Sequence, residues 1–157
     1  MSKKKLFIFG AGHTGKTLAD FADKTDFEVS LIDERVEIVD DLNFGDEINI
    51  IEKNHRSAIK DLKFDHHTYV VVVTHNHSYD RDIIATCAKL PHAYIGMIGS
   101  QRKIEVAKKA YLAGNILTEE EMEKIDWPIG LKINANTPEE IAISILAKLI
   151  KVRNSEI

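Results

Sequence analysis

The sequence predicts an α/β protein: a single doubly wound Rossmann-like domain with a mainly parallel sheet. Short apolar runs alternate with helical patterns from the first residues onward. The apolar runs are continuous, as expected of strands that are buried on both faces. A glycine-rich turn joins the first strand to the first helix. Because a β-α-β-α order requires right-handed crossovers between parallel strands, we expect helices on both faces of the sheet.

The expected elements follow one another in a regular order. The stretch with four consecutive valines within residues 68–75 gives the strongest strand signal. The other strands are predicted at residues 6–9, 27–33, 47–51 and 93–99, and the helices at 13–25, 53–62, 79–90 and 100–113.

Three helix starts carry capping signals. Ser100 can cap the helix that Gly114 and Asn115 close, and Thr118 opens a capping box. Thr137 opens another, with Pro138 at the favoured first helical position. The last helix places an apolar stripe (Ile141, Ile145, Leu149 and Val152) toward the sheet. The connection before it, residues 127–137, is rich in turn residues.

Composition limits the possible functions. The chain has 157 residues, of which 44% are hydrophobic and 29% charged, enough for one domain spanning residues 1–157. A net charge of −4 argues against nucleic-acid binding. No apolar run reaches the ~20 residues of a membrane span and no signal peptide opens the chain, so we expect a cytoplasmic protein. The single cysteine, Cys87, is expected to be a buried, inert thiol on a helix.

The turn after the first strand fits two phosphate-binding motifs. Gly10, Gly12 and Gly15 form G-x-G-x-x-G, whereas Gly10, Gly15 and the Lys16-Thr17 pair form G-x-x-x-x-G-K-T. Both motifs present backbone N–H groups at a helix N-terminus to phosphate. The dinucleotide motif also needs an acidic residue at the end of the second strand, and Asp33 lies there. We therefore favour a dinucleotide, while a magnesium-dependent triphosphate site remains the alternative.

Residues next to Asp33 bear on the choice of cofactor. A carboxylate accepts hydrogen bonds from ribose hydroxyls and repels a 2′-phosphate, so NAD is favoured over NADP. Glu34 follows it in the same turn. Arg35 could weaken the preference by pairing a phosphate, or it could be a surface charge.

Two further turns should lie at the same edge of the sheet. The first holds Thr74, His75, His77 and Asp80; His77 and Asp80 are candidates for proton transfer, and His13 could approach them. A loop held by hydrogen bonds is the alternative, and we favour it over a metal site, so no metal is expected. The second turn holds Gly99, Ser100, Arg102 and Lys103, which could bind an anion or be a solvated basic turn. His55, His66 and His67 are expected on the surface.

Five blocks, "GAGHTG", "LIDER", "VVVVTHNHSYD", "YIGMIGSQRK" and "PIGLKINANTPEEIAISILA", resemble in order the Rossmann domain of the xanthine dehydrogenase accessory protein (XdhC/CoxI) family. The resemblance implies a role in the maturation of molybdenum hydroxylases, with NAD(P) or the molybdenum cofactor as ligand. The motifs and the resemblance together predict cofactor binding by residues of these blocks: Gly10, Ala11, Gly12, His13, Thr14, Gly15, Asp33, Glu34, Arg35, Thr74, His75, His77, Gly99, Ser100, Arg102, Pro128 and Gly130.

Family members often carry an N-terminal domain with a cysteine associated with the molybdenum cofactor. Here the first strand begins at residue 6 and Cys87 does not match that cysteine, so we expect this domain to be absent. The resemblance implies a molybdenum hydroxylase apoenzyme as partner. The expected absence of the N-terminal domain points to a separate chain like it, and a ligand face without a covering domain points to a homodimer. We expect an accessory protein rather than an enzyme; the alternatives are an NAD-dependent oxidoreductase and an NAD-sensing regulatory domain.

Overall fold

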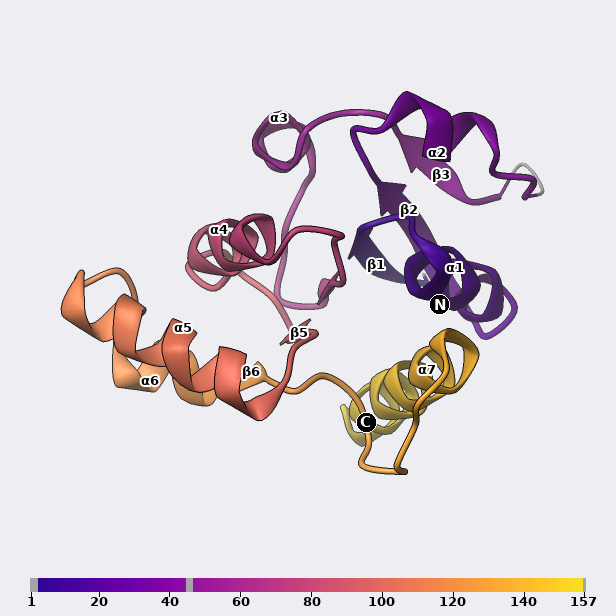
Figure 1. Ribbon diagram of the computed structural model, residues 1–157. Helices are drawn as coiled ribbons and strands as arrows, with labels where there is room; N and C mark the ends of the chain where they lie inside the picture. The colour runs from indigo at the N-terminus through magenta and orange to yellow at the C-terminus, as the bar shows by residue number, and fades with distance from the viewer. Residues whose placement is uncertain (1–2, 45–46, 157) are drawn as a thin grey trace.

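The computed structural model describes residues 3–44 and 47–156, which form a six-stranded parallel sheet in the order β3-β2-β1-β4-β5-β6 (Figure 1). This confirms the predicted doubly wound α/β class. The strands are β1 (Lys4–Phe9), β2 (Phe27–Ile32), β3 (Asn49–Ile51), β4 (Tyr69–Val72), β5 (Tyr94–Met97) and β6 (Ile125–Asp126). The helices are α1 (His13–Asp23), α2 (Val36–Asp40), α3 (His55–Asp61), α4 (His77–Cys87), α5 (Gln101–Ala113), α6 (Glu119–Glu123) and α7 (Pro138–Ser155).

Strand β1 lies at the centre of the sheet. Its Leu6 is in register with Val29 of β2 on one side and with Tyr69 of β4 on the other. The chain runs outward from β1 in both directions, so the strand order reverses between β1 and β4. In open parallel sheets, ligands bind beyond the carboxyl ends of the strands at such a switch point. The three predicted turns all lie at this edge.

Alternate side chains of the strands supply two hydrophobic cores. Leu6, Ile8 and Val71 pack with α1 and α7 on one face of the sheet. Phe7, Val70 and the helices α3, α4 and α5 form the core on the other face. Figure 1 shows α1 and α7 side by side, away from α4 and α5. Within the described residues, no helix is both long and apolar enough to cross a membrane.

The helix ends largely follow the predicted capping. Ser100 accepts a hydrogen bond from the backbone of Lys103, and Thr118 forms a full capping box with Glu121. Thr137 caps α7 in the same way, but the Glu140 carboxylate accepts from Asn136 N instead of closing a box. The apolar stripe of α7 packs as expected, with Ile145 and Leu149 buried.

Two short elements were not predicted. Helix α2 has five residues and none of them is buried, while β6 has two residues. Neither is long enough to carry a recognisable hydrophobic period. Strand β4 also ends at Val72, earlier than predicted, and α4 begins at His77. Cys87 is fully buried, and burial raises the pKa of its thiol to about 12.

Candidate functional site

The three glycines of the first turn have different structural roles. Gly10 has a φ of +114°, and a Cβ on Gly15 would overlap the Gly10 carbonyl oxygen. These two positions therefore require glycine for the turn to form. Gly12 has a φ of −69°, and a Cβ there would meet no atom within 4 Å. The fold gives no reason for a glycine at position 12, but a ligand close to the backbone would.

Helix α1 begins directly after Gly12, which distinguishes between the two phosphate motifs. Lys16 N already donates to Gly12 O at 2.9 Å, and the Lys16 side chain is exposed. A triphosphate loop presents this stretch as loop backbone around the phosphates. Because residues 13–16 are helical here, the turn fits the dinucleotide motif better than the triphosphate loop.

The start of α1 has no side-chain cap. Gly12 makes no capping hydrogen bond and the first turn of α1 contains no acidic residue. By contrast, the side chain at the N-cap accepts a backbone hydrogen bond in α3, α4, α5, α6 and α7. Among the described residues, no side chain caps the first amides of α1 and the first turn of the helix contains no acid, so these amides could bind phosphate.

Asp33 is buried at the end of β2 and holds the glycine turn in place. Its carboxylate accepts hydrogen bonds from Ala11 N at 2.9 Å and from Arg35 N at 2.9 Å. The Arg35 guanidinium adds a fork, with Nε 2.9 Å from Oδ1 and Nη2 2.7 Å from Oδ2. Burial opposes ionisation of Asp33, but these hydrogen bonds outweigh it and lower the pKa of the carboxyl.

The Asp33–Arg35 fork has a consequence for the predicted ribose contact. Four hydrogen bonds occupy the acceptor positions of the Asp33 carboxylate. Ribose hydroxyls could bind there only after Arg35 turns away. Arg35 is therefore a partner of Asp33 rather than a solvated surface charge, while Glu34 is exposed beside it.

The loop between β4 and α4 is held by a second buried carboxylate. Asp80 Oδ1 accepts from Thr74 N at 2.9 Å and lies 2.6 Å from the Thr74 hydroxyl. Burial raises the pKa of Asp80, against the effect of these hydrogen bonds. His77 Nδ1 is 3.6 Å from Asp80 Oδ2, too far for a good hydrogen bond. The hydrogen-bonded loop that we favoured over a metal site is therefore present, with Thr74 as the main partner.

His13, which the sequence analysis said could approach this loop, pairs with helix α7 in the structure. Its Nε2 lies 2.7 Å from Glu139 Oε1 at the start of α7. The described residues contain no group of three His, Cys, Asp or Glu side chains that could hold a metal ion.

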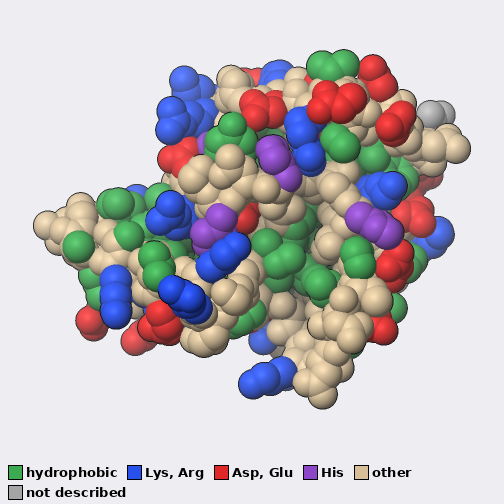
Figure 2. Space-filling view, in the orientation of Figure 1, with side chains coloured by type: hydrophobic (Ala, Val, Ile, Leu, Met, Phe, Trp, Pro, Cys, Tyr) green, Lys and Arg blue, Asp and Glu red, His purple; other side chains and the backbone are tan. Residues whose placement is uncertain are grey.

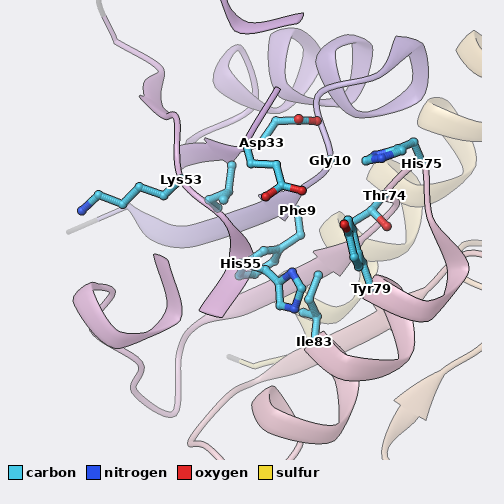
Figure 3. A pocket seen from close by; sticks show the side chains of 11 residues that line it. Phe9, Gly10, Asp33, Lys53, His55, Thr74, His75, Tyr79 and Ile83 are labelled. Carbon is cyan, nitrogen blue, oxygen red and sulfur yellow. The ribbon is translucent and has the colours of Figure 1, made fainter. Parts of the chain in front are cut away.

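A small cavity of about 20 Å³ lies between the glycine turn and α4 (Figure 3). Gly10, Asp33, Thr74 and His75, which the sequence analysis assigned to cofactor binding, all line it. Its lining residues are Phe9, Gly10, Ile32, Asp33, Glu34, Lys53, His55, Thr74, His75, Tyr79 and Ile83.

Sequence reasoning missed His55 and Tyr79, which contribute rings to this cavity. The His55 ring is 5.3 Å from that of Tyr79, and its Nε2 is 2.6 Å from Asp82 Oδ2. The expectation that His55 lies on the surface is wrong, because its side chain is only 15% exposed. Figure 3 shows His55 and Tyr79 side by side, with Lys53 extending away from the other labelled side chains. The position of His55 in the chain could have indicated this, because α3 starts just after β3, at the same edge of the sheet.

The remaining predicted residues lie in two other places. Gly99, Pro128 and Gly130 line a cavity of about 500 Å³ between β5, the 127–137 connection and α7. His77, Ser100 and Arg102 line a separate cavity between α4 and α5. The predicted residues that line a cavity are therefore divided among three cavities along one edge of the sheet. Ala11, Gly12, His13, Thr14, Gly15 and Arg35 line none of these three.

The fold and this edge define the chain as a Rossmann-type protein with a dinucleotide-type glycine turn. The model of the XdhC Rossmann domain matches residues 6–149, so the chain belongs to this family. This confirms the family resemblance of the five sequence blocks.

Relatives of the chain are known from several bacteria. The chain is 32% identical over 151 residues to a probable xanthine dehydrogenase subunit of Bacillus subtilis (strain 168), covering 96% of this chain and 43% of that protein. It is 27% identical over 154 residues to the uncharacterized protein YqeB of Escherichia coli (strain K12), covering 98% and 28%. It is similar to the crystal structure of a xanthine dehydrogenase from Bacillus halodurans, with a TM-score of 0.85, 28% identity, and coverage of 99% and 44%. The chain thus spans less than half the length of each of these relatives.

Proposed function

We propose that this domain binds a dinucleotide, NAD(P) or a molybdopterin-type dinucleotide, with its pyrophosphate against the turn of residues 10–15. The observation that carries the proposal is Gly12. Its missing side chain leaves open space beside the uncapped first turn of α1, and no packing inside the protein requires that space. A pyrophosphate needs both close backbone approach and unpaired amides.

The two halves of the ligand would extend in opposite directions from this turn. One nucleoside would enter the small cavity, where Asp33 accepts from its ribose after Arg35 has moved and Tyr79 lies against the base. That cavity holds about 20 Å³ and must open to admit a base. The other half would lie toward the cavity of about 500 Å³ that Gly99 and Pro128 line, which is large enough for a nicotinamide or pterin group.

The cellular role that fits the family is that of an accessory protein for xanthine dehydrogenase-type molybdenum hydroxylases, acting in the cytoplasm. The apoenzyme, a separate chain like the N-terminal domain of longer family members, and a second copy of this chain are the proposed partners. The molybdenum cofactor, if bound, would supply its own redox chemistry. The chain's residues would hold the pyrophosphate and exclude water from the crevice. Asp80 holds the β4–α4 loop through its hydrogen bonds to Thr74.

Titration calorimetry with NAD, NADP and the isolated molybdenum cofactor tests this proposal. Saturable binding of at least one of them, lost in Gly12→Val, is expected. A protein that binds none of the three, or a Gly12→Val variant that binds as tightly as the wild type, would overturn it. Adding xanthine dehydrogenase apoenzyme with and without the domain, and following the recovery of hydroxylase activity, tests the accessory role.

A further inference from the structure

A cavity of about 460 Å³ between the starts of α4 and α5 has a composition unlike the crevice at the glycine turn. We name it the α4–α5 cavity, lined by His77, Arg81, Ser100, Arg102, Lys103 and Val106. None of these residues lines the cavities beside the glycine turn or the 127–137 connection. The β5–α5 turn lies between the two cavities: Gly99 and Gln101 line the cavity beside the 127–137 connection, while a Cβ on Gly99 would come within 3.5 Å of His77 Cε1.

The cations of the α4–α5 cavity have no acidic partners. Among the residues the structure describes, Arg81, Arg102 and Lys103 make no ion pair with a carboxylate within 4 Å. Many other basic side chains do make such pairs, including Arg35, Lys53 and Lys89. Figure 2 shows blue side chains gathered around a histidine in the left half of the face drawn.

The local backbone adds to this positive potential. Arg102 and Lys103 lie in the first turn of α5, which contains no acidic residue, so they face the positive end of the helix dipole. Such a placement is unfavourable unless an anion binds there. In addition, His77 Nε2 is buried without a hydrogen-bond partner in the described chain. Charge and an unsatisfied polar atom therefore occur at the same cavity.

We propose that the α4–α5 cavity binds the phosphate group of a small phosphate monoester, at a site separate from the dinucleotide turn. Arg81 and Arg102 approach from two different helices and can donate to one phosphate from two sides. The Ser100 hydroxyl accepts from Lys103 N and retains its own proton to donate. Val106, which is 55% exposed, gives the cavity an apolar wall for the organic part of the ligand.

The position suggests how the two sites communicate. His77 lines the α4–α5 cavity, while Thr74 and His75 of the same loop line the cavity beside the glycine turn. A phosphorylated cargo or substrate would therefore be held next to the nucleotide and would contact the loop that both sites share. The inference does not need the dinucleotide proposal to be correct, since no residue of the cavity belongs to the turn of residues 10–15.

Phenyl phosphate and inorganic phosphate are suitable probes, titrated at constant ionic strength into ¹⁵N-labelled protein and followed by amide chemical shifts. The wild type should show saturable shifts centred on residues 77–81 and 99–106. The Arg81→Gln/Arg102→Gln variant should bind at least about tenfold more weakly, since each lost charge-assisted hydrogen bond weakens binding substantially. The charge-matched Lys109→Gln/Lys124→Gln variant should bind as the wild type does, because both lysines are exposed and outside the cavity.

Two further variants separate loss of phosphate binding from unfolding and from binding at the glycine turn. The single substitution Arg102→Gln changes an exposed side chain, so we expect the domain to stay folded. This variant alone should bind the phosphate probe more weakly than the wild type. Gly12→Val should leave the phosphate shifts unchanged; their loss would place the probe at the glycine turn and overturn the proposal. No saturable binding at millimolar probe, or equal weakening in the lysine control, would also overturn it. Failure here with NAD still bound would leave the dinucleotide proposal standing.

Discussion

Gly12 offers the sharpest separation between stability and ligand binding. We consider the substitution Gly12→Val. The φ of −69° and ψ of −172° at this position are accessible to valine, and the added Cβ meets no protein atom within 4 Å. The side chain would instead occupy the space in front of the amides of α1, where the pyrophosphate is proposed to bind.

The expected effect on the unliganded protein is small. Replacing glycine in a compatible conformation reduces the entropy of the unfolded chain and stabilises by about 0.4–1 kcal/mol. Losing a favourable N-cap residue acts in the opposite direction by a similar amount. The free energy of unfolding should therefore change by less than about 1 kcal/mol. By contrast, a ligand at 100 times its dissociation constant stabilises the wild type by about 2.7 kcal/mol. For a domain of this size that corresponds to about 5–11 °C in Tm.

Differential scanning fluorimetry with and without NAD measures both quantities in one experiment. The wild type should show the full ligand shift, and Gly12→Val should keep its unliganded Tm and show no shift. Gly15→Ala is the contrasting control, because its Cβ would overlap the Gly10 carbonyl oxygen and should lower the unliganded Tm. A Gly12→Val protein that retains the full NAD shift would refute the proposed position of the pyrophosphate.

Three further outcomes follow from the same geometry. Lys16→Ala should change the dissociation constant of NAD, measured by calorimetry, by less than about twofold. The reason is that the Lys16 side chain is exposed and its backbone N–H is bonded within α1. Abolished binding would restore the triphosphate alternative. Arg35→Ala frees the Asp33 carboxylate and removes a cation, so NADP should bind about tenfold more weakly relative to NAD, and an unchanged NADP/NAD ratio would contradict this. Because the folded pKa of Asp33 lies below its ordinary 3.8, its carboxylate stabilises the fold above that pH and loses this effect as the pH falls through the folded pKa. The difference in urea stability between wild type and Asp33→Asn should thus be larger at pH 7 than below pH 3.8, and a constant difference would show that the Asp33–Arg35 contacts do not stabilise the fold.

Much of the fold was predictable because its signals are local. The continuous valines of β4, the glycine-rich turn after β1 and the capping threonines before α6 and α7 each determine a short stretch without tertiary contacts. Helix α2 and strand β6 carry no such signal, since their few residues are defined by neighbours in space. The end of β4 is likewise not marked in the sequence: Val73 is still buried and its N–H still donates to Phe9 O, although the strand ends at Val72.

The position of the site could be predicted from the sequence, but the hydrogen-bond and ion-pair partners of its residues could not. Asp33 and Asp80 both lie at the expected edge, yet the sequence could not indicate that Arg35 forks onto one and Thr74 satisfies the other. His13 turns to Glu139, more than a hundred residues away in the chain, a contact that spacing cannot reveal. His55 reaches the crevice only because β3 lies beside β2 in the sheet. Such pairings depend on packing between elements, which local patterns do not encode.

A crystal structure grown with NAD tests the central claim most directly. We predict a pyrophosphate bound by the first amides of α1 in front of Gly12, with the Arg35 guanidinium moved off Asp33 and a ribose in its place. A structure in which the ligand lies elsewhere on the domain, while Arg35 still forks onto Asp33 and the crevice stays closed, would contradict it.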